Sequence, residues 1–348
     1  MRTYQASSAR DASKFIARFS SRKSAAVAER LVAMKLEPLQ DITKLTPLVV
    51  RVLGLNPGTF QLQGTNTYLV GGGKSRLLVD TGEGVDGYVP LVKRALAENG
   101  GESISDVLIT HYHFDHTEGL KDLKATWPEL RAWKLDPGYN GVHGPSFNLV
   151  EAGVKPLVDG QKVTTPDGDA TLCVLATPGH TPDHCAFLLE QENNSVFSGD
   201  CVLGGSSAVF EDLHAYMGSL QKMLTVLEDD GCGPTRAKRT VYPGHGIALT
   251  DGAAAVSEYI KHRTARETQV VQALEGYGSS LTPFGIVRRV YLGLSWKLII
   301  PAAWNTRTVL KKLEADGLAS CSRWIRCSLP LGLDWLLFER WKLLKVKK

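Results

Sequence analysis

The stretch Thr110-His111-Tyr112-His113-Phe114-Asp115-His116 gathers three histidines and a carboxylate within positions 111–116. It follows an apolar run, Asp106–Thr110, that predicts a short buried strand. It precedes a segment of helical spacing, Gly119–Ala125. The stretch is therefore expected to form a tight loop between a strand and a helix, which is where a rigid scaffold usually displays functional side chains.

Side chains that alternate along such a loop can be aimed at one point. We expect His111 and His113 to share one metal ion, and Asp115 and His116 to face a second. Imidazole nitrogens and carboxylate oxygens at this density are ligands of first-row transition metals, and zinc is the commonest hydrolytic choice.

Three further segments place a potential ligand directly after a predicted strand. His180 lies in the Pro/Gly turn Thr177–Pro182, Asp200 ends the strand at Ser195–Ser198, and His245 lies in the turn Pro243-Gly244-His245-Gly246. Cys201 follows Asp200, and strand alternation turns it away from the site, so we interpret it as a packing residue.

The ordered set His-x-His-x-Asp-His, then His, Asp and His, resembles the metallo-β-lactamase superfamily from about Val49 to Arg266. The resemblance implies an α/β fold, an αβ/βα sandwich with two zinc ions at one edge between the sheets. It implies that His111, His113 and His180 hold the first zinc, that Asp115, His116 and His245 hold the second, and that Asp200 bridges them. Asp80, in Leu78-Val79-Asp80-Thr81-Gly82, matches a family aspartate that supports a ligand histidine; its alternative is a buried aspartate that caps a turn.

The expected reaction is hydrolysis by a metal-bridging hydroxide. Two metals about 3.5–4 Å apart acidify a shared water, whose pKa falls from near 16 toward about 7. Asp115 is the candidate catalytic residue, because it can help position that hydroxide and pass a proton to the leaving group.

The rest of the chain predicts three segments: residues 1–47 as a basic leader, 48–263 as the metallo-β-lactamase domain, and 264–348 as a winged-helix-like α+β module with a basic tail. Strands and helices alternate in the second segment, with a hairpin at its start. The expected strands are Leu48–Leu53, Asn66–Val70, Arg76–Asp80, Asp106–Thr110, Leu172–Ala176, Cys185–Glu190, Ser195–Ser198 and Thr240–Tyr242. The expected helices are Tyr88–Glu98, Gly119–Ala125, Tyr216–Glu228, Gly252–Arg266, Glu267–Glu275, Thr282–Tyr291 and Ala302–Ala315, followed by short strands around Ser320–Cys327.

Within the superfamily, Leu62–Val70, Val209–Leu213 and Glu258–Arg263 resemble one branch. That branch contains an animal endoribonuclease, beta-lactamase-like protein two, and fungal thioesterases that release polyketide chains from acyl carrier protein. Only residues 201–244 separate Asp200 from His245, which leaves no room for the inserted domain of the large DNA- and RNA-processing nucleases. The substrates implied are single-stranded RNA or, as the alternative, an acyl carrier protein thioester. A non-catalytic RNA- or protein-binding module is disfavoured by the complete ligand set.

The excess positive charge is unevenly distributed, although the net charge is only +4 in 348 residues. Positions 1–28 are rich in Arg and Ser with a single acid, Asp11, which is typical of an organelle transit peptide. Such a leader predicts the mitochondrial matrix or another organelle, whereas a solvated basic arm would leave the chain in the cytoplasm. The six cysteines contain no Cys-x-x-Cys pair, and no apolar run is long enough for a membrane span.

A basic C-terminal segment is the candidate contact for an anionic polymer. Its cations are Lys297, Arg307, Lys311, Lys312, Arg323 and Arg326. Arg307 and Lys311 share one helix face, and the alternative is an ordinary solvated surface. A winged-helix-like module also often serves as a dimer surface, so a homodimer is a further possibility. Of the remaining histidines, His184 and His262 are expected near the site, and His143 and His214 outside it.

Overall fold

Strands buried on both faces form the centre of the molecule. The computed structural model describes residues 36–141, 143–192, 194–229, 238–293, 299–323, 336–337 and 339–344. One sheet has seven strands in the order β1 (Ile42–Lys44), β2 (Val49–Leu53), β3 (Asn66–Val70), β4 (Ser75–Val79), β5 (Ser103–Ile109), β6 (Arg131–Lys134) and β7 (Val154–Pro156). A second sheet has five, in the order β12 (Val241–Pro243), β11 (Ser195–Gly199), β10 (Cys185–Leu189), β9 (Thr171–Ala176) and β8 (Lys162–Thr164).

Alternation along the strands explains why their sequences are almost continuously apolar. Tyr68 and Val70 of β3 face the second sheet, where they join a core with Phe187 of β10. Leu69, between them, packs on the opposite face with the helices that cover the first sheet. Because successive side chains point to opposite faces, a strand packed on both faces needs an apolar residue at nearly every position.

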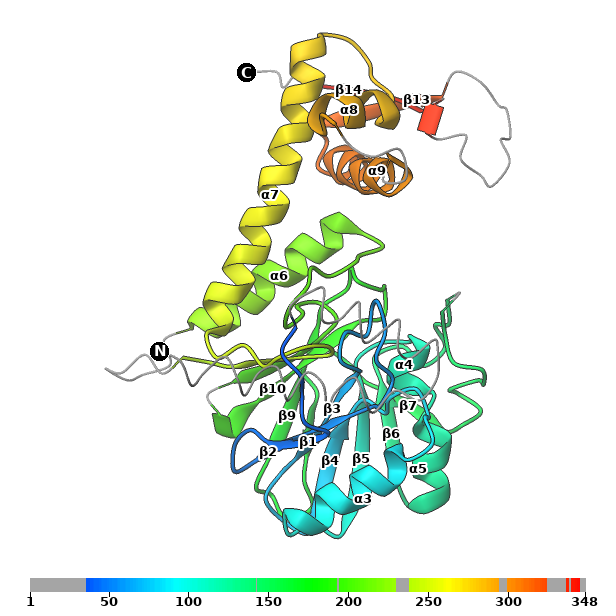
Figure 1. The fold of residues 1–348 in the computed structure, drawn as a ribbon, viewed down its shortest axis with the longest axis vertical. Coiled ribbons are helices and arrows are strands. Elements are labelled where there is room, and N and C mark those ends of the chain that lie inside the picture. Colours follow the sequence, from blue (N-terminus) through cyan, green and yellow to red (C-terminus); the bar gives the residue numbers. More distant parts are fainter. Residues whose placement is uncertain are drawn as a thin grey trace, which may run out of the picture.

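Helices cover the outer face of each sheet (Figure 1). On the first sheet these are α3 (Tyr88–Glu98) and α5 (Leu120–Thr126), with the one-turn helix α4 (Phe114–Thr117) between them in the chain. On the second sheet they are α6 (Leu213–Glu228) and the first part of α7 (Gly252–Tyr277), and a short 3-10 helix, η1 (Glu190–Glu192), follows β10. The order helix, sheet, sheet, helix is the predicted αβ/βα sandwich.

A smaller module stands on the end of α7 (Figure 1). It consists of α8 (Pro283–Val290), α9 (Ile299–Ala315) and the antiparallel pair β13 (Ala319–Arg323) and β14 (Glu339–Leu343). Leu281 adds two backbone hydrogen bonds with Trp341 at the other side of β14, 2.8 and 2.9 Å long. No helix in the described parts of the chain combines the length and apolarity that a membrane span requires.

The structure corrects part of the expected secondary structure. Gly252–Arg266 and Glu267–Glu275 are one uninterrupted helix, α7, because no Gly or Pro occurs between Ala253 and Glu275, and the helix ends at the left-handed cap Gly278. The helix therefore runs through the boundary expected at 264. The sequence did not predict β1, β6, β7, β8 or β14, whose polar residues hide the alternation. Residues 324–327 of the expected last strand lie outside the described residues.

Candidate metal centre

The seven expected ligand side chains converge at one edge of the sandwich because five strands end there. The strands β4 and β5 are parallel, β11 and β12 are parallel, and β9 runs in the direction of β11. Their carboxyl ends therefore meet at the same edge, and each is followed by a loop that carries a site residue. Sheet contacts across the edge, such as Cys185 N–H to the Thr110 carbonyl at 2.9 Å, hold these loops together.

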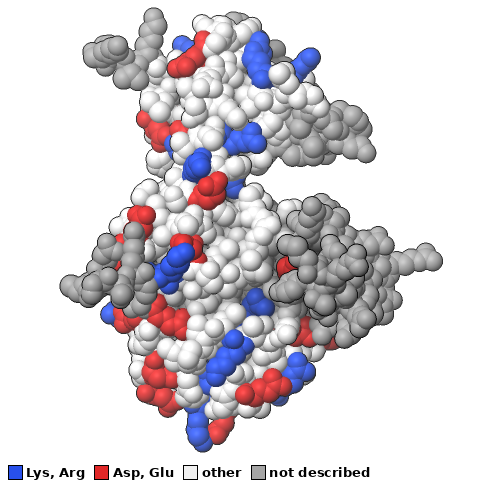
Figure 2. Space-filling view, turned by 60° about the vertical axis from the view of Figure 1, so that its left-hand side comes forward, with Lys and Arg blue, Asp and Glu red and all other residues white. Residues whose placement is uncertain are grey.

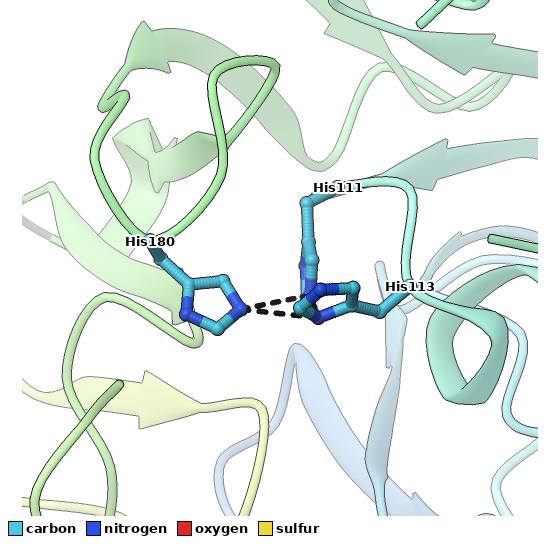
Figure 3. Close-up of side chains that lie close together, drawn as sticks. All are labelled: His111, His113 and His180. Carbon is cyan, nitrogen blue, oxygen red and sulfur yellow. Dashed lines mark hydrogen bonds between the residues drawn. The ribbon is translucent and has the colours of Figure 1, made fainter. Parts of the chain in front are cut away.

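His111, His113 and His180 form a compact triangle of nitrogens (Figure 3). His111 Nε2 lies 2.9 Å from His113 Nδ1, and His180 Nε2 lies 3.2 Å from each of them. Tetrahedral zinc with bonds of about 2.0–2.1 Å needs nitrogens roughly 3.3 Å apart. The three rings thus stand at the separation that one such ion requires.

A second triplet, Asp115, His116 and His245, lies beside the first. Asp115 Oδ2 is 3.6 Å from His116 Nε2 and 3.4 Å from His245 Nε2. Asp200 stands between the two triplets, with Oδ1 3.5 Å from His116 Nε2 and Oδ2 3.7 Å from His180 Nε2. Both Asp115 and His116 belong to the one-turn helix α4, which begins five residues before the helix expected at Gly119.

The tautomers of three histidines follow from their outer hydrogen bonds. His116 Nδ1 donates to Asp80 Oδ2 at 2.8 Å, and His180 Nδ1 donates to the Val209 carbonyl at 2.7 Å. His111 Nδ1 lies 3.0 Å from Thr110 Oγ1, whose hydroxyl donates to Asp80. With the proton on the outer nitrogen, each ring turns the lone pair of Nε2 toward the centre, as a metal ligand must.

The charges of the site also call for a cation. Asp80, Asp115 and Asp200 are all buried, and among the described residues their ion-pair partners are histidines. Burial opposes a charged imidazole, yet Asp115, Asp80 and Asp200 together raise the pKa of His116 to about 10. His116 Nε2 and Asp200 Oδ1 are buried without a hydrogen-bond partner. A bound metal ion would satisfy both this imidazole nitrogen and this carboxylate oxygen. The residues present therefore fit a metal pair.

Two glycines make room for this arrangement. A Cβ on Gly244 would stand 2.4 Å from Asp200 Oδ1, and one on Gly179 would stand 2.3 Å from the backbone of Tyr216. Gly179 also has a φ of 131°, which side-chain-bearing residues rarely adopt. Each glycine directly precedes a histidine of the cluster, so both histidine loops depend on a close backbone approach.

Three further groups lie at or near the site. One was expected there, one was expected elsewhere, and one was not expected from the sequence. His184 was expected near the site, and its Nε2 accepts a hydrogen bond from the Asp200 backbone N–H at 3.2 Å. His143 was expected outside it, but it lines the same cavity, with its ring centroid 6.1 Å from that of His113. Lys134 and Asp183 form a buried ion pair that ties β6 to the loop after His180. No spacing signal could have found it, because Lys134 lies on β6 and Asp183 lies in the loop between β9 and β10, far away in the chain.

The remaining expectations have mixed outcomes. Cys201 is fully buried in the apolar core, as interpreted. His214 lies outside the site and pairs with Asp316 at 2.7 Å. His262 is exposed on α7 and does not line the cavity, so the expectation that it lies near the site is wrong.

The cluster opens into a cavity of about 1110 Å³. Small-molecule sites usually enclose roughly 300–1,000 Å³, so this one has room for an extended substrate. Its floor includes His113, Asp115, His180, Asp200 and His245. Its walls come from the loop after β2, the loop after β11 and the inner face of α9, with aromatic side chains Phe60, Tyr112, Phe114, Tyr139, Phe210 and Trp304.

The sandwich and its His/Asp cluster define a metal-dependent hydrolase. A family model described as the metallo-beta-lactamase superfamily matches residues 61–245, which include every residue of the cluster. The chain belongs to the metallo-beta-lactamase superfamily.

Curated relatives extend beyond that match. A beta-lactamase-like protein 2 homolog of Caenorhabditis elegans is 40% identical over 80% of this chain and 88% of its own. An atrochrysone carboxyl ACP thioesterase of Aspergillus chevalieri is 42% identical over 69% of this chain and 70% of its own. Among solved structures, a beta-lactamase domain protein from Burkholderia ambifaria has a TM-score of 0.63 at 20% identity, covering 87% of this chain and 93% of that one. A metallo-beta-lactamase family protein from Thermus thermophilus has a TM-score of 0.59 at 20% identity, covering 86% and 100%. Identities this low show the fold alone.

Proposed function

We propose that this hydrolase is a zinc-dependent endoribonuclease that acts on single-stranded RNA. The observation that carries the proposal is the cavity, in which a His/Asp cluster fit for two metals faces aromatic side chains and a cation across an open cleft. Proteins that bind single strands combine aromatic stacking surfaces with positive charge along the backbone. The sequence alone gave no sign of such a surface, because Phe60, Tyr139 and Trp304 lie far apart in the chain.

In this proposal His111, His113 and His180 would hold the first zinc, and Asp115, His116 and His245 would hold the second. Asp200, which approaches both triplets, would serve both ions. Zinc in these positions would polarise the scissile phosphoryl group and lower the pKa of water from 15.7 toward about 7.

The protein's own groups then orient the reaction. Asp115 lines the cavity and accepts a hydrogen bond from Thr65 Oγ1 at 3.2 Å, which fixes its carboxylate at the edge of the cluster. From there it can accept a proton from the attacking water and return it to the leaving oxygen. Asp80 holds His116 directly, and His111 through Thr110, so it acts as a positioning residue.

Thioester hydrolysis is the second candidate, and one observation favours it. The relative whose name states a reaction, the Aspergillus chevalieri protein, is an acyl carrier protein thioesterase. The apolar walls of the cavity, including Leu203, Val209 and Phe210, also suit an acyl chain. The animal relative, however, aligns with more of this chain, 80% against 69%.

The test is a side-by-side assay of the purified protein with zinc on a single-stranded oligoribonucleotide and on an acyl carrier protein thioester. We expect RNA cleavage that is lost in Asp200→Asn and retained in His262→Ala, an exposed histidine remote from the cavity. Thioester turnover without RNA cleavage would reject the ribonuclease proposal in favour of the second candidate.

We further propose that residues 264–348 act as a winged-helix-like module. The order of its elements supports this, since α8 and α9 precede an antiparallel pair, and Leu281 pairs with β14 as a third short strand would. Delivery to the mitochondrial matrix by residues 1–47 and formation of a homodimer remain proposals of the same kind.

A further inference from the structure

Helix α9 presents one stripe of side chains to the metal-centre cavity. Trp304, Arg307, Thr308 and Lys311 follow the i, i+3, i+4, i+7 spacing and all line it. On the opposite side Ala303, Leu310 and Leu313 are fully buried in the core. The C-terminal module therefore completes the substrate cleft of the sandwich, and α9 is its far wall.

Ion pairs fix α9 in this position. Arg307 makes a two-pronged pair with Glu339 of β14, with both contacts at 2.7 Å. Lys312 pairs with Glu267 of α7 at 2.9 Å and also with Asp316. These contacts are half-buried or better, so the stripe is a fixed surface and not a mobile flap.

Both Arg307 and Lys311 line the cleft, but these ion pairs leave Lys311 as the described cation of the expected basic set that has no acidic partner there. Arg307 and Lys312 are engaged within the module, Lys297 and Arg326 lie outside the described residues, and the side chain of Arg323 is not described. Lys311 is exposed, lines the cavity and has no acidic partner among the residues that the structure describes.

Trp304 stands two turns before Lys311 on this stripe, with 54% of its surface exposed. Seven residues of helix separate the two side chains by roughly 10 Å along the axis. Phe60, which lines the same cavity, is 70% exposed and offers a second accessible aromatic face. The flat face of Trp304 and the cation of Lys311 are spaced along one helix. This arrangement matches a ligand that has planar rings and a separate negative charge.

We propose that α9 carries a substrate subsite in which Trp304 stacks on a nucleobase and Lys311 contacts a backbone phosphate of single-stranded RNA. The inference rests on the proposed ribonuclease function and names the residues outside the metal centre that select an extended substrate. On the face shown in Figure 2, the described Lys, Arg, Asp and Glu side chains are interspersed. Within the cavity, Lys311 is the described cation without an acidic partner, so affinity should come from stacking more than from many phosphate contacts.

The experiment measures RNA binding and cleavage in four variants of the full-length protein. Trp304→Ala should weaken binding of a fluorescent oligoribonucleotide, read by anisotropy with a chelator present, by roughly 5- to 150-fold, the effect of losing one stacked base. Trp304→Phe, which keeps an aromatic face, should restore most of it. Lys311→Glu should weaken binding at low salt and flatten the slope of log affinity against log salt by about 0.7, the share of one phosphate on a single strand.

Lys342→Glu is the matched control, because Lys342 is exposed on β14 of the same module and does not line the cavity. All variants should hydrolyse the small phosphodiester bis(p-nitrophenyl) phosphate as the unchanged protein does, since it reaches only the metal centre. If the unchanged protein cleaves RNA and Trp304→Ala and Lys311→Glu do so equally well, the subsite is rejected while the ribonuclease function stands. If the unchanged protein neither binds nor cleaves RNA, both proposals fail together.

Discussion

Asp80 shows how much of the metal centre depends on one side chain outside the ligand set. It has a left-handed backbone, with a φ of 60°, at a cost of about 1–2 kcal/mol for a residue other than glycine. Its Oδ1 accepts the Thr110 backbone N–H at 2.8 Å, and its Oδ2 accepts both His116 Nδ1–H and the Thr110 hydroxyl. One carboxylate thereby sets the ring orientation of His116 and, through Thr110, of His111.

Asp80→Asn should lower zinc affinity by about 10- to 100-fold, the usual effect of losing a partner of ligand histidines. The amide keeps the shape of the side chain, but its nitrogen cannot accept the hydrogen bond from His116 or from Thr110. Competition with a chromophoric chelator measures the affinity. Asp122→Asn, at an exposed position of α5, is the control, and equal affinities in the two variants would contradict the positioning role.

Asp200→Ala should reduce the bound metal more than any single histidine substitution, because its carboxylate approaches both triplets. We expect about two zinc ions per chain in the unchanged protein and fewer than one in the variant, counted by elemental analysis after dialysis. His262→Ala serves as the histidine control, and His143 does not, since it lines the cavity. One zinc ion per unchanged chain, or mainly iron, would refute the two-zinc centre.

At the scale of elements, α7 holds the loop that anchors a ligand histidine. Tyr259 accepts a hydrogen bond from Leu203 N–H at 3.0 Å, and Arg263 donates to the Ala208 carbonyl at 2.8 Å. The guanidinium also lies over the Phe210 ring, 4.8 Å from its centroid. The next carbonyl in that loop, that of Val209, accepts a hydrogen bond from His180 Nδ1–H. The two sequence motifs 209–213 and 258–263 are therefore two sides of one contact.

Arg263→Ala should loosen this loop and lower zinc affinity by roughly 10-fold, at the lower end of effects on supporting groups. The change should also raise KM more than it lowers kcat, because Phe210 and Val209 line the cavity. Zinc competition and steady-state kinetics measure the two effects. Lys261→Ala is the control, because Lys261 is an exposed neighbour that pairs with Glu258 on the same helix. A loss of thermal stability with normal zinc affinity would reduce Arg263 to a packing role.

At the scale of the molecule, the sandwich encloses three buried carboxylates whose repulsion a metal pair would relieve. An ion present at 100 times its Kd adds about 2.7 kcal/mol to the free energy of unfolding. At about 2.1 cal/mol/K per residue, the unfolding entropy of a chain of this size is about 0.7 kcal/mol/K, so each ion should raise Tm by roughly 4 °C. Treatment with a chelator should lower Tm by this amount, and zinc should restore it while magnesium does not. An unchanged Tm would show that the site does not hold metal tightly.

Residues 1–35, which lie outside the described residues, are expected to be dispensable for catalysis. The deletion stops short of the whole expected leader, residues 1–47, because the Glu37 carbonyl accepts a hydrogen bond from Gln63 Nε2 at 2.8 Å and Ile42–Lys44 forms β1. A chain that begins at Leu36 should keep its Tm and kcat, while a fluorescent fusion of it should lose any organelle localisation. A localisation that does not change with this deletion would count against a transit role.

The sequence by itself was enough to predict the sandwich and the His and Asp side chains that cluster at its edge. A buried strand followed by a turn is a local pattern, and His111, His180 and His245 each follow one, so their convergence required only that the strand ends meet. The sequence did not predict that α7 is a single helix, because the helical spacing continues through Arg266 without a signal that distinguishes one helix from two.

Only the tertiary structure decided which cations and aromatic side chains line the cavity, and which cation there lacks an acidic partner among the described residues. Arg307 and Lys311 are equivalent in sequence and both line the cavity, yet Arg307 is engaged by Glu339, 32 residues away on β14. Phe60 and Trp304 also line that cavity, although they lie far apart in the chain. Such pairings join residues far apart in the chain, and side chains respond to the charges and surfaces that folding brings beside them, which no local pattern encodes.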